Sequence, residues 1–269
     1  MAASPAKRYA LGFVPTMGAL HEGHLSLVRR AKAECRKVVV SIFVNPTQFG
    51  PREDFKKYPR QLARDKALLR RAGAVEVFSP RVAEVYPQGF ASTVRVGGAL
   101  GSALEAEFRP GHFDGVATVV ARLFGLVRPQ RAYFGLKDFQ QLQVIKRMTA
   151  DLALPVTIVE CPTLREPDGL ALSSRNAYLT PAERAKAPSL WHALHAAADA
   201  LADGASFAAA EAAGRSSLAR AGGFQLQYLR LADAESLLPP GPRSKRLVLA
   251  AAARLGRTRL IDNLVLTRA

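Results

Sequence analysis

The chain has 269 residues, of which 49% are hydrophobic, and it carries a formal net charge of +16. This length and composition suffice for a sizeable buried core, so they argue against an intrinsically disordered chain and predict one large or two modest domains. No stretch of about 18 apolar residues is present and the first residues do not look like a signal peptide, so we expect a soluble protein. Its two cysteines lie far apart in the sequence, which is typical of a reduced, cytoplasmic protein.

Strand-like and helix-like segments alternate through the first part of the chain. Strands are predicted at residues 9–14, 38–44, 75–78, 93–96, 132–134 and 156–160, and helices at residues 23–36, 61–72, 114–127 and 139–152. Residues 97–111 are rich in glycine and are predicted to form a loop. Strands separated by helices of this length imply right-handed crossovers, so we expect an α/β fold with a Rossmann-like parallel sheet.

The composition changes after about residue 163. Alanine-rich helices are predicted at residues 181–201 and 207–221, followed by strands at 225–231, 246–252 and 259–266. We therefore expect two domains, a Rossmann-like domain at residues 1–163 and a smaller α+β domain at residues 164–269.

The segment PTMGALHEGH, residues 15–24, connects the first predicted strand to the first predicted helix. Gly18 and Gly23 allow the backbone to approach a ligand closely, and a helix N-terminus offers unpaired N–H groups to an anion. His21 and His24 are three positions apart, so within a helix both point to one side. This arrangement favours a phosphate site.

Other readings of this segment fit less well. A helical zinc site requires HExxH, whereas HEGH has its histidines three positions apart, and the cysteines Cys35 and Cys161 form no CxxC pattern. The segment is neither a Walker sequence nor GxGxxG. It resembles the HxGH site of nucleotidyltransferases and class I aminoacyl-tRNA synthetases, which transfer adenylyl groups.

Six segments in register extend this resemblance over nearly the whole chain. They are PTMGALHEGH, VVVSIFVNPTQF, YPR, RPGHFDGVATVV, FGLKDFQQL and DGLALSSRN. Together they resemble the pantoate–β-alanine ligase family. The resemblance implies ATP-dependent condensation of pantoate with β-alanine through a pantoyl adenylate, with Mg²⁺ on the phosphates, a homodimer, and a second domain that closes over the nucleotide as a lid.

Adenylation of a carboxylate requires cations and N–H donors around the α-phosphate. His21, His24 and Lys137 are the expected catalytic groups, and Ser173, Ser174 and Arg175 form a donor cluster similar to the mobile KMSKS-type loop. The resemblance implies that ATP contacts Met17, Gly18, Ala19, Leu20, His21, Glu22, Gly23, His24, Gly135, Leu136, Lys137, Asp138, Leu164, Leu172, Ser173, Ser174 and Arg175. No metal ligand of the protein itself is expected.

Gln48 and Gln141 are expected to bind the pantoate, because an amide can donate to its hydroxyl and carboxylate without adding charge. Pro15, Met17 and Val116 are candidates for apolar walls of that pocket. Arg109 and His112 in RPGHF are candidates for the pocket edge, and a role in holding the loop is equally compatible with the sequence.

Two positions depart from the family pattern. Leu136 stands where the family usually has glutamate, so only a backbone contact to the nucleotide is expected there, and Phe139 replaces a usual tyrosine. Asp138 begins the following helix, so it is a candidate helix cap, ribose ligand, or both. The chain also starts almost at its first strand, whereas family members generally have a helical segment before it.

The basic composition raises a second class of function. A net charge of +16 attracts nucleic acid, but Lys and Arg are spread along the chain and no RRM, zinc-finger or basic-zipper pattern is present. We therefore expect small-molecule substrates and no nucleic-acid partner. A nucleotidyltransferase with another acceptor is the nearest enzymatic alternative.

Overall fold

The computed structural model describes residues 8–51, 53–73 and 76–268, which form two compact units. The first unit comprises the described residues up to Val96 together with Gly111–Leu136 and Gln141–Pro162. The second comprises Gly97–Pro110, Lys137–Gln140 and Thr163 onward. The predicted boundary between residues 163 and 164 stays a prediction, and the second unit also takes in two segments that precede it.

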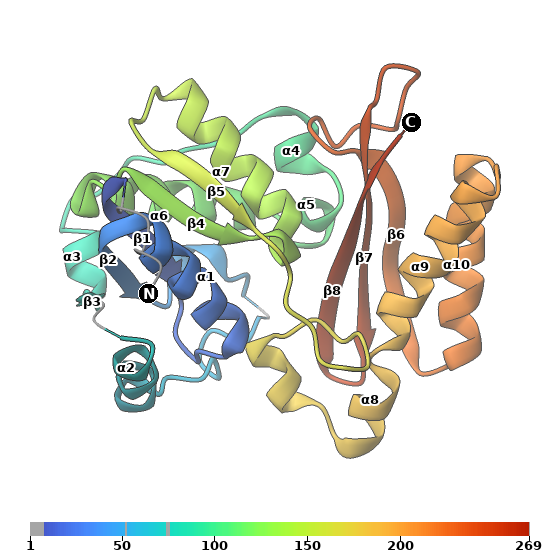
Figure 1. The fold of residues 1–269 in the computed structure, drawn as a ribbon, viewed down its shortest axis with the longest axis horizontal. Coiled ribbons are helices and arrows are strands. Elements are labelled where there is room, and N and C mark those ends of the chain that lie inside the picture. Colours follow the sequence, from blue (N-terminus) through green and yellow to red (C-terminus); the bar gives the residue numbers. More distant parts are fainter. Residues whose placement is uncertain (1–7, 52, 74–75, 269) are drawn as a thin grey trace, which may run out of the picture. The chain divides into compact units, whose positions relative to one another are not determined.

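The first unit is built on a five-stranded parallel sheet with the strand order β3-β2-β1-β4-β5 (Figure 1). This finding confirms the predicted α/β class. The strands are β1 (Tyr9–Thr16), β2 (Cys35–Ile42), β3 (Glu76–Phe78), β4 (Arg131–Gly135) and β5 (Thr157–Cys161). The helices are α1 (Glu22–Glu34), η1 (Pro46–Gln48), α2 (Leu62–Arg71), α3 (Val82–Val85), α6 (His112–Val127) and α7 (Phe139–Asp151), whose first two residues belong to the second unit.

The strand order reverses between β1 and β4. The chain runs outward from β1 through β2 to β3, then returns to the other side of β1 with β4 and continues to β5. In open parallel sheets, ligands bind beyond the carboxyl ends of the strands at such a reversal. The segments that follow β1 and β4, which begin at Met17 and Leu136, both start at this edge of the sheet.

A buried apolar cluster joins α1 to the sheet. Val28 and Ala31 of α1 pack with Val14 of β1 and Val40 of β2, and none of these four side chains is exposed to solvent. The first strand passes close to its neighbours at Gly12, where an added Cβ would lie 2.9 Å from the Cys35 sulfur. These contacts fix the carboxyl end of β1, from which the HxGH segment departs.

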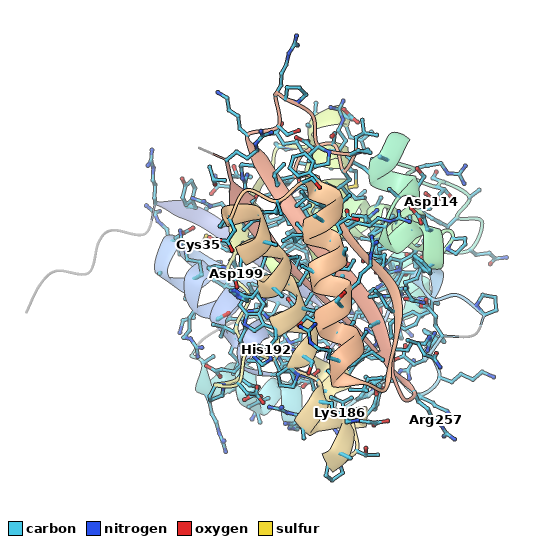
Figure 2. The ribbon with its side chains drawn as sticks, turned by 90° about the vertical axis from the view of Figure 1, so that its right-hand side faces the viewer. Cys35, Asp114, Lys186, His192, Asp199 and Arg257 are labelled. Atoms are coloured by element: carbon cyan, nitrogen blue, oxygen red, sulfur yellow. The ribbon has the colours of Figure 1, made fainter. Side chains whose placement is uncertain are left out.

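The second unit contains an antiparallel sheet with the order β6-β7-β8. Its strands are β6 (Phe224–Asp233), β7 (Arg246–Leu255) and β8 (Thr258–Thr267), and its helices are α4 (Gly98–Ser102), α5 (Glu105–Phe108), η3 (Ser174–Tyr178), α8 (Pro181–Lys186), α9 (Ser189–Ala202) and α10 (Phe207–Ala221). Figure 2 shows α9 and α10 side by side in front of this sheet, with His192 and Asp199 on α9. Leucines and alanines of both helices pack on the alternating apolar residues of the strands.

The structure corrects three predictions of secondary structure. Residues 93–96 form no strand, because the N–H of Val94 donates to the Thr118 hydroxyl at 2.9 Å instead of to a neighbouring strand. The predicted loop at 97–111 contains the short helices α4 and α5. The helix predicted at 181–201 is interrupted after Lys186, next to Pro188, which has no N–H to donate.

Two further predictions, one for a strand and one for membrane spans, are compared here with the described residues. The start of the strand predicted at 75–78 falls on Val75, which lies outside the described residues, and Glu76–Phe78 forms β3. Among the described residues, no helix is both long and apolar enough to cross a membrane.

Candidate active site

Two histidines cap the N-terminus of α1 reciprocally. His21 Nδ1 accepts the N–H of Gly23 at 3.2 Å, and His24 Nδ1 accepts the N–H of His21 at 3.4 Å. A ring nitrogen that accepts an N–H carries no proton, so each neutral imidazole holds its proton on Nε2. The ring centroids lie 4.1 Å apart. The local sequence therefore sets both imidazoles as Nε2–H donors beside the positive end of a helix dipole.

A buried carboxylate holds the turn that leads to these histidines. The Oδ2 and Oδ1 atoms of Asp65 accept the N–H groups of Ala19 and Leu20, each at 2.9 Å. Gly18 and Ala19 both have positive φ angles, 84° and 50°, and the second is unusual for a residue with a side chain. The Gly18 N–H also donates to Thr16 Oγ1 at 3.2 Å. The strained turn is thus fixed from both sides.

Asp65 was not among the site residues predicted from the sequence, although α2 carries a signal for it. Asp65 and Leu69 are four positions apart and both are buried, so the carboxylate lies on the apolar face of an amphipathic helix. The YPR motif fixes the chain before this helix, because Arg60 donates to the carbonyl oxygens of Phe55 at 2.9 Å and Tyr58 at 3.2 Å. The motif therefore helps to place Asp65 under the HxGH turn.

The segment after β2 is tied to the same turn through Gln48. Asn45, which is only 1% exposed, donates through Nδ2 to Gln48 Oε1 and to the carbonyl oxygen of Gly115, both at 3.1 Å. Gln48 Nε2 lies 3.3 Å from the sulfur of Met17. Tyr86 donates to Asn45 Oδ1 at 2.7 Å, and burial raises the pKa of this phenol, which keeps it protonated as a donor.

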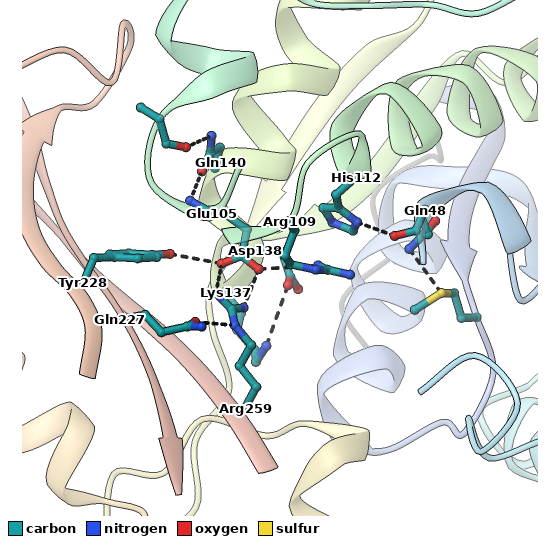
Figure 3. A network of polar contacts seen from close by, with 12 residues as sticks. Gln48, Glu105, Arg109, His112, Lys137, Asp138, Gln140, Gln227, Tyr228 and Arg259 are labelled. Carbon is teal, nitrogen blue, oxygen red and sulfur yellow. Dashed lines mark hydrogen bonds and ion pairs between the residues drawn. The ribbon is translucent and has the colours of Figure 1, made fainter. Parts of the chain in front are cut away.

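Helix α6 supports Gln48 from the other side. His112 Nδ1 lies 2.8 Å from the carbonyl oxygen of Gln48 (Figure 3), and because a carbonyl only accepts, His112 carries its proton on Nδ1. This tautomer is opposite to that of the HxGH histidines. At Gly115 an added Cβ would lie 2.5 Å from the Thr47 carbonyl oxygen, so glycine is required for the close approach of α6 to η1.

Other residues expected to contact substrates lie at the start and end of structural elements. Gly135 ends β4 and Leu136 follows it, while Gln141 lies in the first turn of α7. Pro15 and Met17 lie at the end of β1 and just beyond it, and Val116 is buried in α6. All of these residues belong to the first unit.

Lys137 and Asp138 belong to the second unit. The Lys137 ammonium lies 3.7 Å from Asp138 Oδ1, and the Lys137 carbonyl oxygen accepts the side-chain amide of Asn263 at 2.9 Å. Asn263 is in the middle of β8, a strand for which no site residue was predicted from the sequence. Lys137 is therefore tied to strand β8 within the second unit.

The loop that contains the serine and arginine cluster is closed by its own backbone. The N–H of Leu172 donates to the carbonyl oxygen of Leu164 at 2.9 Å, and Arg165 and Ala171 form an isolated antiparallel bridge. Ser173 caps the short helix η3, since its Oγ accepts the N–H of Arg175 at 3.3 Å. Ser174 and Arg175 begin that helix.

Arg109 takes part in an ion-pair network around Glu105 (Figure 3). Glu105 is 6% exposed and binds Arg259 through both carboxylate oxygens, at 2.5 and 2.8 Å, while Arg109 lies 3.4 Å away. Tyr228 donates to the same carboxylate at 3.1 Å, and burial raises the pKa of this phenol. Gln140 accepts the Glu105 N–H at 2.9 Å. These contacts favour a loop-holding role for Arg109.

The expected site residues thus fall into two sets, one in each unit. The first holds the HxGH turn, Gln48, His112 and Gln141, and the second holds Lys137, Asp138 and the loop from Leu164 to Arg175. Within the described chain, no group of three or more His, Cys, Asp or Glu side chains could hold a metal ion.

Comparison with known proteins gives a consistent result. Residues 1–265 match the family model described as pantoate-beta-alanine ligase. The chain is 58% identical over 255 residues to a pantothenate synthetase from Acidiphilium cryptum, covering 95% of this chain and 91% of that protein. It is 54% identical to the pantothenate synthetase of Thermus thermophilus, with 96% and 93% covered.

Comparison with solved structures leads to the same family. A crystal structure of the Thermus thermophilus pantothenate synthetase superposes with a TM-score of 0.92 at 54% identity, covering 98% of this chain and 95% of that chain. A pantoate-beta-alanine ligase from Francisella tularensis, complexed with beta-gamma ATP and beta-alanine, superposes with a TM-score of 0.77 at 36% identity, with 96% and 90% covered.

Proposed function

The chain belongs to the pantoate–beta-alanine ligase family, as its six sequence motifs predicted, and we propose that it forms its product through a pantoyl adenylate. It is a ligase that joins pantoate to β-alanine to give pantothenate, with ATP as the activating substrate. The first half-reaction must activate the pantoate carboxylate, since a carboxylate does not react directly with an amine.

The reaction takes place in two balanced steps. A pantoate carboxylate oxygen attacks the α-phosphorus of ATP, and the bond from that phosphorus to the bridging oxygen breaks, which releases pyrophosphate. The β-alanine amine then attacks the acyl carbon of the adenylate, loses a proton, and expels AMP. Negative charge grows on the phosphoryl oxygens during the first step, so the main requirement is preorganised donors around the α-phosphate.

His21 and His24 meet this requirement in the proposed site. Their Nδ1 atoms are occupied by backbone N–H groups, which leaves the proton of each neutral ring on Nε2 as a donor for phosphoryl oxygens. The N-terminus of α1 adds the positive end of its dipole. This pair of capped imidazoles is the observation that carries the proposal, and we assign His24 and His21 as catalytic residues.

The remaining roles follow the chemistry of each side chain. Lys137 supplies a point charge to the phosphates, and Ser173, Ser174 and Arg175 donate hydrogen bonds to them. The ATP contacts proposed from the sequence, from Met17 to His24, Gly135 to Asp138, and at Leu164 and Leu172, keep their assignment. Gln48 and Gln141 bind pantoate, with Gln48 already oriented by Asn45 and close to Met17.

The proposal also covers the role of Mg²⁺, the oligomeric state and the cellular location. Mg²⁺ usually keeps several waters and binds substrate phosphates, so it would enter with ATP and neutralise charge on the leaving pyrophosphate. This role fits a site with histidine, lysine, serine and arginine donors that bind phosphate rather than metal. We also propose that the protein is a homodimer, as the family resemblance implied, and that it is cytoplasmic, as expected from its sequence.

The experiment that tests the function is exchange of labelled pyrophosphate into ATP, with pantoate present and with pantoate withheld. Exchange that depends on pantoate and needs no β-alanine is the expected result, because adenylate formation is reversible before the amine arrives. Exchange without pantoate would instead indicate an adenylyl transferase with a different acceptor, which is the alternative that the HxGH motif leaves open.

A further inference from the structure

Strand β8 carries two adjacent buried polar residues, Asp262 and Asn263, within the otherwise apolar stretch LIDNLVL at residues 260–266. Asp262 is 5% exposed and Asn263 is 7% exposed. Burying a carboxylate and an amide in a strand of leucine, isoleucine and valine is costly unless both are paired, and even a paired buried charge contributes little net stability. Their presence therefore calls for a reason other than packing.

Asn263 holds one of the two segments of the second unit that are proposed to bind phosphate. Its side-chain amide donates to the carbonyl oxygen of Lys137 at 2.9 Å, across 126 residues of sequence. A lysine ammonium is carried on a long four-carbon stem, so its position depends on the turn from which that stem extends. Fixing the carbonyl of Lys137 fixes the direction in which that side chain leaves the backbone.

Asp262 holds the other segment. Its two oxygens bind Arg165 in a bidentate pair at 2.6 and 2.8 Å, and Arg165 also donates to the Gly169 carbonyl oxygen at 3.0 Å. The Arg165 guanidinium stacks on Trp191, with 3.4 Å between its carbon and the ring centroid. Gly169 is required there, since a Cβ would lie 2.3 Å from the Trp191 ring.

These contacts continue into the serine and arginine cluster. Arg165 forms a backbone bridge with Ala171, and the next hydrogen bond of this small loop joins Leu172 to Leu164. Ser173 follows directly, so the loop that presents Ser173, Ser174 and Arg175 is anchored at its base by Arg165. The N–H of Asn263 donates to Asp262 Oδ1 at 2.8 Å, which joins the two anchors.

We propose that Asp262 and Asn263 act as a positioning pair, which fixes the Lys137 turn and the Ser173–Arg175 loop to one another so that both meet the same triphosphate. All of these residues lie in the second unit. The inference rests on the proposed function, since it assigns the pair to the adenylation step. Neither residue is a catalytic group, because each acts through a backbone carbonyl or through Arg165.

Two variants test the positioning pair, and each removes a contact of one of its two residues. Asn263→Leu keeps the approximate size of the side chain and removes the donor to Lys137, while Arg165→Lys keeps the charge and removes the bidentate fork. The double variant combines them. Glu211→Leu is the matched control, because Glu211 also accepts a backbone N–H, that of Leu231 at 2.8 Å, but joins α10 to β6.

The measurements are the thermal unfolding midpoint of each variant and its pantoate-dependent pyrophosphate exchange over a range of ATP concentrations. We expect Asn263→Leu and Arg165→Lys each to lower kcat by about tenfold to a hundredfold, as small misplacements of reacting groups do. The double variant should lose little more than the worse single one, because both substitutions break the same unit. Glu211→Leu should shift the midpoint while kcat stays within about twofold of wild type.

Three results would overturn the inference. They are a wild-type kcat in a folded Asn263→Leu variant, a double variant whose loss equals the product of the single losses, or a kcat that falls in Glu211→Leu as much as in Asn263→Leu. If Asn263→Leu does not fold, Arg165→Lys decides alone, and wild-type kcat in that variant overturns the inference. Wild-type protein without pantoate-dependent exchange would instead overturn the proposed function, so the two failures are distinguishable.

Discussion

The Asp65 carboxylate accepts the backbone N–H of Ala19 at 2.9 Å, although the two residues are 46 positions apart. Ala19 has a φ of 50°, a conformation that costs a residue with a side chain roughly 1 kcal/mol or more. Asp65 is fully buried and also accepts the N–H of Leu20. A strained turn of the HxGH motif is therefore stabilised by a side chain from helix α2, which is distant in the sequence.

Replacement of this carboxylate tests its role directly. We expect Asp65→Asn to lower the free energy of unfolding by about 1–3 kcal/mol, because an amide offers one acceptor where two backbone N–H groups need one each. Pyrophosphate exchange should fall by about tenfold or more, since the turn carries His21 and His24. Urea unfolding and exchange kinetics measure the two effects.

Asp151→Asn is the control for this substitution. Asp151 is on the surface at the end of α7, where it pairs with Arg147, and exposed pairs contribute at most about 1 kcal/mol. Unchanged unfolding and exchange in Asp65→Asn, equal to those of the control, would contradict the proposed support of the turn.

The two nitrogens of His24 can be tested separately. His24→Ala should lower adenylate formation by roughly 10²- to 10³-fold, as loss of one preorganised donor typically does. His24→Asn can still accept the N–H of His21 through its side-chain oxygen, whereas His24→Gln places an N–H donor near the original Nε2. We therefore expect His24→Asn to retain more stability and His24→Gln to retain more activity, as measured by thermal unfolding and pyrophosphate exchange.

Equal activity in His24→Asn and His24→Gln would show that Nε2 of His24 is not the atom that contacts the phosphoryl oxygens. A zinc-selective phenanthroline should leave wild-type exchange unchanged, because the histidines are assigned to phosphate and not to metal. Inhibition that added zinc reverses would contradict this assignment.

Two glycines of α6 provide a matched pair of substitutions. Gly115→Ala places a Cβ 2.5 Å from the Thr47 carbonyl oxygen, so η1 and Gln48 must shift, and we expect a loss of about 1–3 kcal/mol together with a higher pantoate KM. Gly125 has open space around its Cβ position, so Gly125→Ala should stabilise the helix by about 0.5–1 kcal/mol. Urea unfolding and exchange at varied pantoate distinguish them, and a Gly115→Ala variant as stable as Gly125→Ala would refute the close approach.

The two glutamines proposed to bind pantoate are tested by a change of charge. Gln48→Glu and Gln141→Glu should each raise the pantoate requirement tenfold or more, about 1.4 kcal/mol, because a carboxylate repels the pantoate carboxylate and cannot donate as the amide does. ATP affinity measured alone, by calorimetry, should change little. If it falls as much as pantoate affinity, the two residues belong to the nucleotide pocket.

The basic charge of the chain gives a prediction against the nucleic-acid hypothesis. With +16 spread along the sequence, duplex DNA should bind only at about 10⁻⁴ M or weaker near 150 mM salt, in line with nonspecific electrostatic attraction. Fluorescence anisotropy with a labelled duplex measures this affinity. Submicromolar binding at that salt concentration would reinstate a nucleic-acid partner.

Most of the regular secondary structure was predictable because its signals are local. The helices at 114–127, 139–152 and 207–221 were placed to within about two residues of α6, α7 and α10, since their apolar patterns and stopping residues lie within the elements themselves. The strand predicted at residues 93–96 was wrong for the opposite reason, because the contact that decides its structure is not local. Its residues have strand propensity, but the side chain of Thr118 takes the backbone N–H of Val94, and no local pattern reveals that partner.

The sequence by itself determined the α/β class and placed the HxGH motif at the start of the first helix, because the signals for both lie in residues that are neighbours along the chain. The reciprocal capping of α1 by His21 and His24 is a local contact that the structure revealed. The sequence also determined the family, since six motifs in register identify it before any contact is known. These properties depend on residue type and spacing, which a sequence contains in full.

Only the tertiary structure decided which distant groups hold the motifs in place. Asp65 beneath Ala19, Asn263 on Lys137, and Arg259 on Glu105 join residues 46, 126 and 154 positions apart. Which side chains meet over such separations depends on how strands and helices pack. A polar residue on an apolar helix face or within an apolar strand indicates that it has a partner, but does not indicate which residue that partner is. The physical reason is that packing alone brings each of these buried polar groups to the partner that compensates its loss of water.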